Sequence, residues 1–318
     1  MAKVLAVVPT LAKNIPRLNN AISSIREKTT EPDLEVVVVL NSNEEISANI
    51  LGADRILYPG LNLGYVGAIE WVRETSKAEY LWVVQDDMTL LNDVLSFLLL
   101  DMERDENLAI SSPLLVRNGI VPARTRGGVF TDHTCTKWEN VPYIDTKIHE
   151  WVPIPDLSFV SGAGALFRFN ALQTVGGFDV SLFPLMHVDV EISFRLLQAG
   201  YRIDLCHEAH IEHEIQGSTP RSLVTLLDQL NRKVVSQKMI KSDKVPFSIN
   251  ATINPKIIGL IASKASQIII HISQEADALR IERDTLRIER ENMISSTSWR
   301  VTQPLRAFKT FISNQKSL

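Results

Sequence analysis

Residues Tyr80–Asp87 read YLWVVQDD, an unbroken apolar run that ends in an amide and two acids. A run without alternation is typical of a strand that is buried on both faces of a parallel sheet. Two similar runs come earlier in the chain, at Val4–Val8 and Glu35–Leu40. Amphipathic helical patterns at 18–25 and 66–72 separate the three runs. This order predicts an α/β fold whose mostly parallel sheet has helices on both faces.

The ends of these three runs are the first place to look for a site, because ligands bind beyond the carboxyl ends of parallel strands. A pair of carboxylates at the end of a buried strand is destabilising unless a cation neutralises it. Asp86 and Asp87 therefore predict a Mg²⁺ or Mn²⁺ ion that also contacts phosphate oxygens of a substrate. The competing interpretation is that the two acids cap a helix expected at Leu91–Leu100.

A second block of polar residues follows Gly176-Gly177-Phe178-Asp179. Glu191 and Arg195 are four residues apart, which predicts an ion pair on one face of a helix from Val188 to Ala199. Asp189 then points elsewhere and has the chemistry of a general base. Electrostatic stabilisation of the helix start is the alternative role for this acid.

The segment between the two blocks, Ser111–Pro155, lacks a regular pattern and carries aromatic residues such as Trp151. A long segment of this kind inside an α/β domain is typically a functional loop or a small subdomain.

Charge is unevenly distributed along the chain of 318 residues, which has a net charge of −4. Residues 1–240 have a net charge of −9, whereas residues 241–318 have +5. An acidic body is no nucleic-acid binder, but a basic tail indicates an anionic partner of its own. We therefore expect a catalytic domain at 1–240 and a helical, basic tail at 241–318.

Two parts of this tail have helical patterns. Within 272–294, the heptad LRIERDT is followed by LRIEREN. This repeat predicts either a short coiled coil that self-associates or a solvated helix held by pairs such as Arg280–Asp284 and Arg287–Glu291. Residues 299–313 predict a basic, aromatic-bearing helix that either lies on an anionic membrane surface or packs on protein.

Cysteine content and hydropathy indicate the compartment. The two cysteines, Cys135 and Cys206, form no disulfide framework, which fits a reducing compartment. The sequence contains no charge-free apolar window of about 20 residues, and its start reads as a strand and not as a signal peptide. We expect a cytoplasmic protein, peripheral on the inner face of the cell membrane where the tail binds it.

Taken in order, these motifs resemble the family 2 inverting glycosyltransferases with the GT-A fold. The resemblance covers about residues 3–220, and its most specific part, Gly176–Ile203, is similar to the segment that carries the family's base. The other matching segments are Val7–Thr10, Asn62-Leu63-Gly64, Gln85-Asp86-Asp87, Ser161–Gly164 and His213.

The resemblance implies transfer of a sugar from a nucleotide-diphosphate donor to an acceptor hydroxyl, with inversion at the anomeric carbon. Asp189 would be the catalytic base, and Mg²⁺ or Mn²⁺ held by Asp87 and His213 would stabilise the leaving diphosphate. The donor-binding residues that it implies are Pro9, Thr10, Asn41, Asn62, Gly64, Gln85 and Asp86. The acceptor side would include Trp151, Gly162 and Glu191.

The resemblance further implies a saccharide or lipid-linked saccharide acceptor in bacterial surface polysaccharide synthesis, such as O-antigen or capsule, and a rhamnosyltransferase-like deoxysugar donor. Two positions depart from the family pattern. Leu40 stands where an acid usually ends the second strand, and Val188-Asp189 replaces a Glu-Asp pair. A catalytically silent GT-A scaffold subunit of a polysaccharide assembly complex is therefore the second hypothesis.

Overall fold

The computed structural model describes residues 2–42, 49–122, 127–131, 137–140, 145–150, 157–214, 221–241, 274, 277–289 and 291. The chain divides into two units, Met1–Ala262 and Ser263–Leu318, and each unit is described by itself. The predicted boundary near residue 240 stays a prediction, because residues 242–273 lie outside the described part of the chain.

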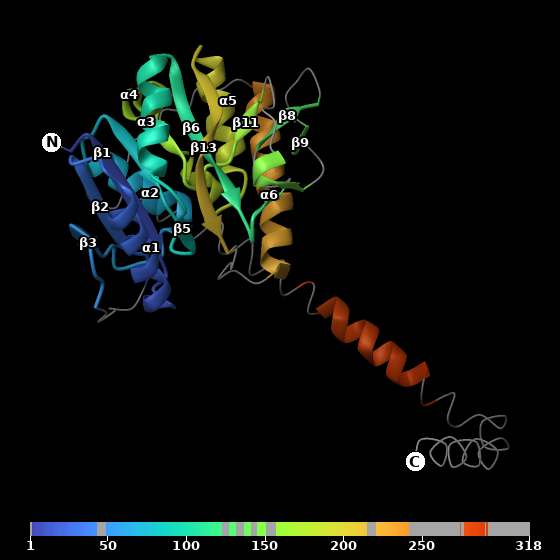
Figure 1. The fold of residues 1–318 in the computed structure, drawn as a ribbon. Coiled ribbons are helices and arrows are strands. Elements are labelled where there is room, and N and C mark those ends of the chain that lie inside the picture. The colour runs from blue at the N-terminus through green and yellow to red at the C-terminus, as the bar shows by residue number, and fades with distance from the viewer. Residues whose placement is uncertain are drawn as a thin grey trace. The chain divides into compact units, whose positions relative to one another are not determined.

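An eight-stranded sheet forms the centre of the first unit, with the strand order β3-β2-β1-β4-β12-β6-β13-β5 (Figure 1). These strands are β1 (Val4–Thr10), β2 (Leu34–Leu40), β3 (Arg55–Leu57), β4 (Tyr80–Val83), β5 (Met88–Leu90), β6 (Leu108–Val116), β12 (Leu166–Arg168) and β13 (Arg202–His213). Strands β1 to β4 run parallel, and β6 is parallel to β13. Strands β12 and β5 are antiparallel to their neighbours. The predicted mostly parallel sheet is confirmed.

Both faces of this sheet are buried, as the unbroken apolar runs predict. In β1, Val4, Ala6 and Val8 contribute to the core on one face, whereas Leu5 and Val7 contribute to the core on the other. This alternation follows from the two-residue period of side chains along a strand. An apolar residue is therefore required at every position, which explains why the run has no polar member.

Helices cover the two faces. The α-helices are α1 (Ile15–Lys28), α2 (Gly64–Thr75), α3 (Val94–Arg104), α4 (Phe169–Thr174), α5 (Val188–Gln198) and α6 (Arg221–Lys241). The apolar sides of α1 and α3 share a core with one face of the sheet, and those of α2, α4, α5 and α6 share a core with the other. Helix α5 ends where Gly200 takes a φ of +88°, as predicted.

The segment predicted to be irregular from Ser111 begins differently. Ser111 to Val116 continue β6, and every residue of this strand is buried, so the irregular part starts only after Val116. Two small sheets follow: β7 (Ile120–Val121) pairs with β10 (Thr146–Lys147), and β8 (Gly127–Phe130) lies between β9 (Trp138–Asn140) and β11 (Phe159–Val160). Short 3-10 helices occur at η2 (Ile148–Glu150) and η3 (Val180–Leu182). The prediction of a small subdomain describes this region better than that of a single loop.

The described part of the second unit is a helix over residues 277–289, with helical residues also at 274 and 291. Leu279, Ile281, Leu286 and Ile288 are each more than half exposed. At 100° per residue, the two leucines lie on one side of the helix and the two isoleucines on the other. Arg287 pairs with Glu291 as predicted, but Arg280 pairs with Asp277 instead of Asp284, which bonds Arg283. The coiled coil stays a prediction.

Within the described residues, no helix combines the length and the apolar character needed to cross a bilayer. The amphipathic helix predicted at 299–313 lies outside the described residues.

Candidate active site

Asp86 links three elements at the edge where β1 and β4 end. Its carboxylate accepts a hydrogen bond from Thr10 Oγ1 at 2.5 Å and one from Arg17 Nη2 at 2.9 Å. Thr10 ends β1 and Arg17 lies in the first turn of α1, so these contacts hold Asp86 against both elements. Arg17 was not among the predicted site residues, because nothing in its sequence context relates it to an acid 69 positions away.

The competing role for Asp86 and Asp87, as caps of a helix, is wrong. Strand β5 follows the two acids directly, and α3 begins only at Val94. Asp93 caps this helix by accepting a hydrogen bond from the backbone N–H of Ser96 at 3.3 Å. Asp86 and Asp87 therefore take no part in capping α3, and they lie at the carboxyl edge of the sheet.

Asp87 lies next to His213, the last residue of β13. Both side chains are about nine-tenths buried, and the His213 Nε2 atom is 3.3 Å from Asp87 Oδ1. Burial favours the neutral acid, but the hydrogen bond and charge of His213, together with the charge of Arg17, outweigh it and hold the pKa of Asp87 below its ordinary value. Asp87 is therefore an ionised acid. The Nδ1 atom of His213 is buried and has no hydrogen-bond partner in the part of the chain that the structure describes.

The turn Asn62-Leu63-Gly64 lies beside the carboxyl edge, and Asn41 holds it there. Asn41 accepts a hydrogen bond from the backbone N–H of Leu63 at 2.6 Å and donates one to the carbonyl of Gly64 at 2.9 Å. Asn62 closes the turn by accepting from the backbone N–H of Gly64 at 2.8 Å. Both ends of this buried amide bond the turn, so the donor-binding role expected of Asn41 stays a prediction. Pro9 lies in β1, paired in register with Val39.

Gly64 lies against the segment that precedes α5. It has a φ of +69°, and a Cβ atom at this position would lie 2.6 Å from the Phe183 ring and 2.7 Å from Pro184 Cα. The next residue, Tyr65, donates its backbone N–H to the carbonyl of Pro184 at 2.7 Å. Only glycine fits this approach, so the turn and the segment at 183–184 are fixed to each other.

Tyr65 is a candidate site residue that sequence reasoning missed. Its side chain hydrogen-bonds Gln85. Burial raises its pKa well above the ordinary value, and the negative charges of Asp189 and Asp87 raise it further. Both carboxylates therefore lie close enough to Tyr65 to act on it. The sequence feature that could have indicated Tyr65 is its position directly after the Asn-Leu-Gly turn, at the start of α2.

Asp189 occupies the first turn of α5 and is partly exposed. Its Oδ1 accepts the backbone N–H of Val190 at 2.9 Å, and the backbone of Gly162 also bonds this carboxylate. Burial raises the pKa of Asp189, against the charge of His187 and these hydrogen bonds. A Cβ on Gly162 would lie 3.5 Å from the Cβ of Asp189, so the structure brings these two predicted residues together.

Glu191 forms the ion pair that its spacing to Arg195 predicts, and its acceptor-side role stays a prediction. Its carboxylate is buried and accepts two hydrogen bonds from Arg195, at 2.7 and 2.6 Å, as the four-residue spacing predicts. Arg195 also donates to the carbonyls of Val175 and Gly177. The pair therefore anchors the glycine turn to α5. Trp151, the remaining acceptor-side prediction, lies outside the described residues.

A second buried ion pair anchors the other side of this glycine turn. Glu70 of α2 accepts two hydrogen bonds from Arg73, at 2.8 and 2.7 Å, and one from the backbone N–H of Phe178 at 2.9 Å. Gly177 has a φ of +77°, and a Cβ there would lie 2.2 Å from Glu70 Oε1. The motif therefore requires glycine because two ion pairs enclose it.

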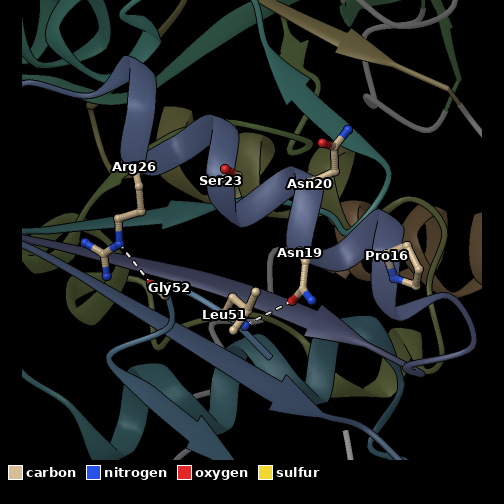
Figure 2. Close-up of a pocket in the computed structure, with 7 residues that line it drawn as sticks. All are labelled: Pro16, Asn19, Asn20, Ser23, Arg26, Leu51 and Gly52. Carbon is tan, nitrogen blue, oxygen red and sulfur yellow. Dashed lines mark hydrogen bonds between the residues drawn. The ribbon is translucent and has the colours of Figure 1, made fainter. Parts of the chain in front are cut away.

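A surface pocket between α1 and the loop at 49–54 is separate from these carboxylates (Figure 2). Its polar side chains bond the loop: Arg26 donates to the carbonyl of Gly52 at 2.9 Å, and Asn19 accepts from the backbone N–H of Leu51 at 3.0 Å. None of the predicted site residues lines it. The pocket marks a structural contact and not the candidate active site.

Comparison with known proteins identifies the fold and the family. The structure is similar to the crystal structure of GalNAc-T7 with UDP, GalNAc and Mn²⁺, with a TM-score of 0.57 and 14% sequence identity. The match covers 74% of this chain, and the chain spans 48% of the length of that neighbour. At this identity the likeness shows the fold, which is the GT-A fold predicted from the sequence.

A comparison with curated proteins finds no sequence match. The family model described as "Glycosyl transferase family group 2" matches residues 82–273, a span that begins in β4 and includes both Asp87 and Asp189. This span is more than half of the chain, so the chain belongs to the family described as glycosyl transferase family group 2.

Proposed function

We propose that the protein transfers a sugar from a nucleotide-diphosphate sugar to an acceptor hydroxyl, with inversion at the anomeric carbon. The single observation that carries this proposal is that one short loop joins the two acids: Gly164 donates its backbone N–H to the carbonyl of Val83, at the end of β4 before Asp87, at 2.8 Å, and the backbone of Gly162 bonds Asp189. Inverting transfer needs a group that stabilises the leaving diphosphate and a base for the attacking hydroxyl. Two acids from distant parts of the sequence, joined by one loop, supply both requirements.

The donor side would be formed by the ends of β1 and β4. Asp87 and His213 fit a divalent ion, because their facing atoms are 3.3 Å apart and ligands about 2.1 Å from one ion have neighbours about 3 Å away. No group of three His, Cys, Asp or Glu side chains suited to a metal occurs among the described residues, so substrate phosphate oxygens would complete the coordination. When bound, such an ion supplies positive charge to the developing diphosphate. The Mn²⁺ and UDP in the GalNAc-T7 crystal support this assignment.

The remaining donor contacts would come from this chain's own polar groups. Thr10 and Arg17 orient the Asp86 carboxylate, which then faces the nucleotide as a fixed acceptor. The backbone of the Asn62–Gly64 turn lies at the same edge, because Asn41 ties it to the end of β2. Gln85, bonded to Tyr65, would orient the sugar between the two acids.

Asp189 would accept the proton of the acceptor hydroxyl. Its raised pKa brings it closer to the operating pH, which makes a carboxylate a better base. Hydrogen bonds from Val190 and Gly162 fix the carboxylate in one orientation. Partial exposure leaves it accessible to an acceptor.

We place this reaction in bacterial surface polysaccharide synthesis, on a saccharide or lipid-linked saccharide acceptor, in the cytoplasm at the inner face of the membrane. The basic character of residues 241–318 supports contact with an anionic surface. Deletion of residues 294–318 should move the protein from the membrane fraction to the soluble fraction while transfer to a soluble acceptor continues. An unchanged distribution would remove the membrane role.

The direct test is a panel of nucleotide-diphosphate sugars with Mn²⁺ or Mg²⁺, in which released diphosphate and the anomeric configuration of the product are measured. Asp87→Asn and Asp189→Asn should both lose turnover, whereas Glu106→Gln, at an exposed turn, should retain it. Absence of donor binding and of turnover across the panel would favour the scaffold hypothesis, which the buried Leu40 and the occupied Asn41 amide motivate.

A further inference from the structure

The residues directly before Asp189 have an unusual backbone. Met186 and His187 are adjacent, neither is glycine, and their φ angles are +82° and +61°. Left-handed backbone of this kind costs about 1–2 kcal/mol per residue and persists only where surrounding groups hold it. Such strain is concentrated at functional sites, so the groups that hold it here are of interest.

Helix α6 supplies these groups. Its Asn231 side chain is fully buried, and its Nδ2 lies within hydrogen-bond distance of the carbonyls of Leu182, Leu185 and Met186, at 2.9, 2.6 and 3.2 Å. Lys238 of the same helix pairs with Asp179. In Figure 1, α6 is the orange helix, which passes β9. The helix thus holds the strained segment at several points.

His187 connects this helix to the base. Its Nε2 lies 2.8 Å from Asp228 Oδ1 on α6, and its ring packs edge-on against Trp138 with centroids 5.2 Å apart. Arg232 of α6 lies over the same Trp138 ring. Burial lowers the pKa of His187, and the charge of Arg232 on α6 lowers it further, whereas the negative charges of Asp189 on α5 and Asp228 on α6 oppose this shift. His187 therefore lies within the electrostatic reach of two acids, one of them the proposed base.

We propose that His187, held by Asp228, is a positioning residue that fixes the start of α5, where its carbonyl accepts the backbone N–H of Glu191 at 3.0 Å, and thereby places Asp189 and favours its ionised form. This inference rests on the proposed function. Because a carboxylate only accepts, Asp228 orients the ring with its Nε2–H toward α6. Protonation of His187 favours the ionised form of Asp189, and Asp228 favours that protonation against the effect of burial. No sequence motif pointed to His187 or Asp228, because they are 41 residues apart and meet only in the fold.

The test begins with the protein alone. The histidine resonances are titrated by NMR in wild type, Asp228→Asn and Asp189→Asn, with His187→Gln used to assign the signal. Both acid variants should lower the pKa of His187 by about one pH unit, since each removes a negative charge that stabilises the imidazolium. Lys233→Gln, an exposed charge change on the same helix, should leave it unchanged. An identical titration in all of these proteins would overturn the coupling.

The second part uses the donor that turns over in the panel with Mn²⁺. Asp228→Asn should shift the acidic limb of the kcat/KM profile to higher pH, and Asp228→Glu should restore the wild-type position. A purely structural role for Asp228 would lower kcat/KM equally at every pH, and that result would refute the positioning role. Absence of turnover with the NMR coupling intact would count against the proposed function alone.

Discussion

Asp87 and Asp189 are both acids near Tyr65, yet their surroundings act in opposite directions. Asp87 lies beside His213 and within reach of Arg17, whose charges hold its pKa below the ordinary value. Asp189 lies where burial outweighs every favourable contact, and its pKa is raised. One acid is thus suited to remain an anion and bind a cation, and the other is suited to take up a proton. Environments that move two pKa values apart assign different chemical roles to the same residue type.

The largest expected effect comes from removing each acid in turn. Asp189→Asn should lower kcat by about 10²–10⁴-fold, because general-base catalysis contributes about that much. Binding of the donor should persist, since the donor side stays intact. Asp87→Asn should instead abolish Mn²⁺-dependent donor binding, measured by calorimetry. Identical defects in binding and turnover for the two variants would contradict the assignment of different roles to the two acids.

The next effect concerns stability on the Asp189 side. Gly177→Ala should lower the free energy of unfolding by about 3 kcal/mol or more, because the new Cβ separates the buried Glu70–Arg73 pair. Thermal or urea unfolding measures the change.

Gly60→Ala is the matched control for this variant. Gly60 has a similar φ of +74°, but a Cβ there would meet no atom within 4 Å. Gly60→Ala should lower the free energy of unfolding by only about 1–2 kcal/mol, which is the strain of an alanine at a positive φ. Equal losses for the two variants would show that the ion pair plays no part.

A smaller effect, about tenfold per pH unit, is expected in the pH dependence of turnover at saturating donor and metal. The base acts only when ionised, so kcat should rise with pH up to the pKa of Asp189 and then level off. Because that pKa is raised, the limb should lie above the ordinary value of 3.8. Asp189→Glu should move the limb upward by about half a pH unit, as the ordinary pKa of Glu is higher. If the pH profile of kcat were the same for Asp189→Glu and wild type, the titrating group would be a residue other than Asp189.

The smallest effect is expected for Tyr65→Phe. It removes the hydroxyl that bonds Gln85, a contribution of about 1 kcal/mol, so kcat/KM should fall about five-fold and the melting temperature should fall by about 2–4 °C. Steady-state kinetics with the donor varied would measure it. An equal kcat/KM for Tyr65→Phe and wild type would show that the Tyr65 hydroxyl, although close to both acids, does not contribute to the reaction.

The sequence predicted the sheet and the two acids because both depend on local patterns. Strands buried on both faces need unbroken apolar runs, and acids that follow such strands lie at the carboxyl edge. Contacts between distant elements were beyond prediction. Asn41 follows a strand in the position of a ligand-binding residue, yet its amide bonds the turn at Leu63 and Gly64. Arg17, Tyr65 and Asp228 were missed for the same reason, since their partners are distant in sequence.

The fit of Gly64 against Phe183 and Pro184 bears on how enzymes of this kind can be re-engineered. The turn at Asn62–Gly64 and the segment that joins η3 to α5 before Asp189 are fixed to each other, because a methyl group added at Gly64 would lie only 2.6–2.8 Å from the facing atoms. A turn grafted here from another family member would therefore displace Asp189 unless the segment at 183–184 were transplanted with it. Redesign of this scaffold would therefore have to exchange the two segments as a pair.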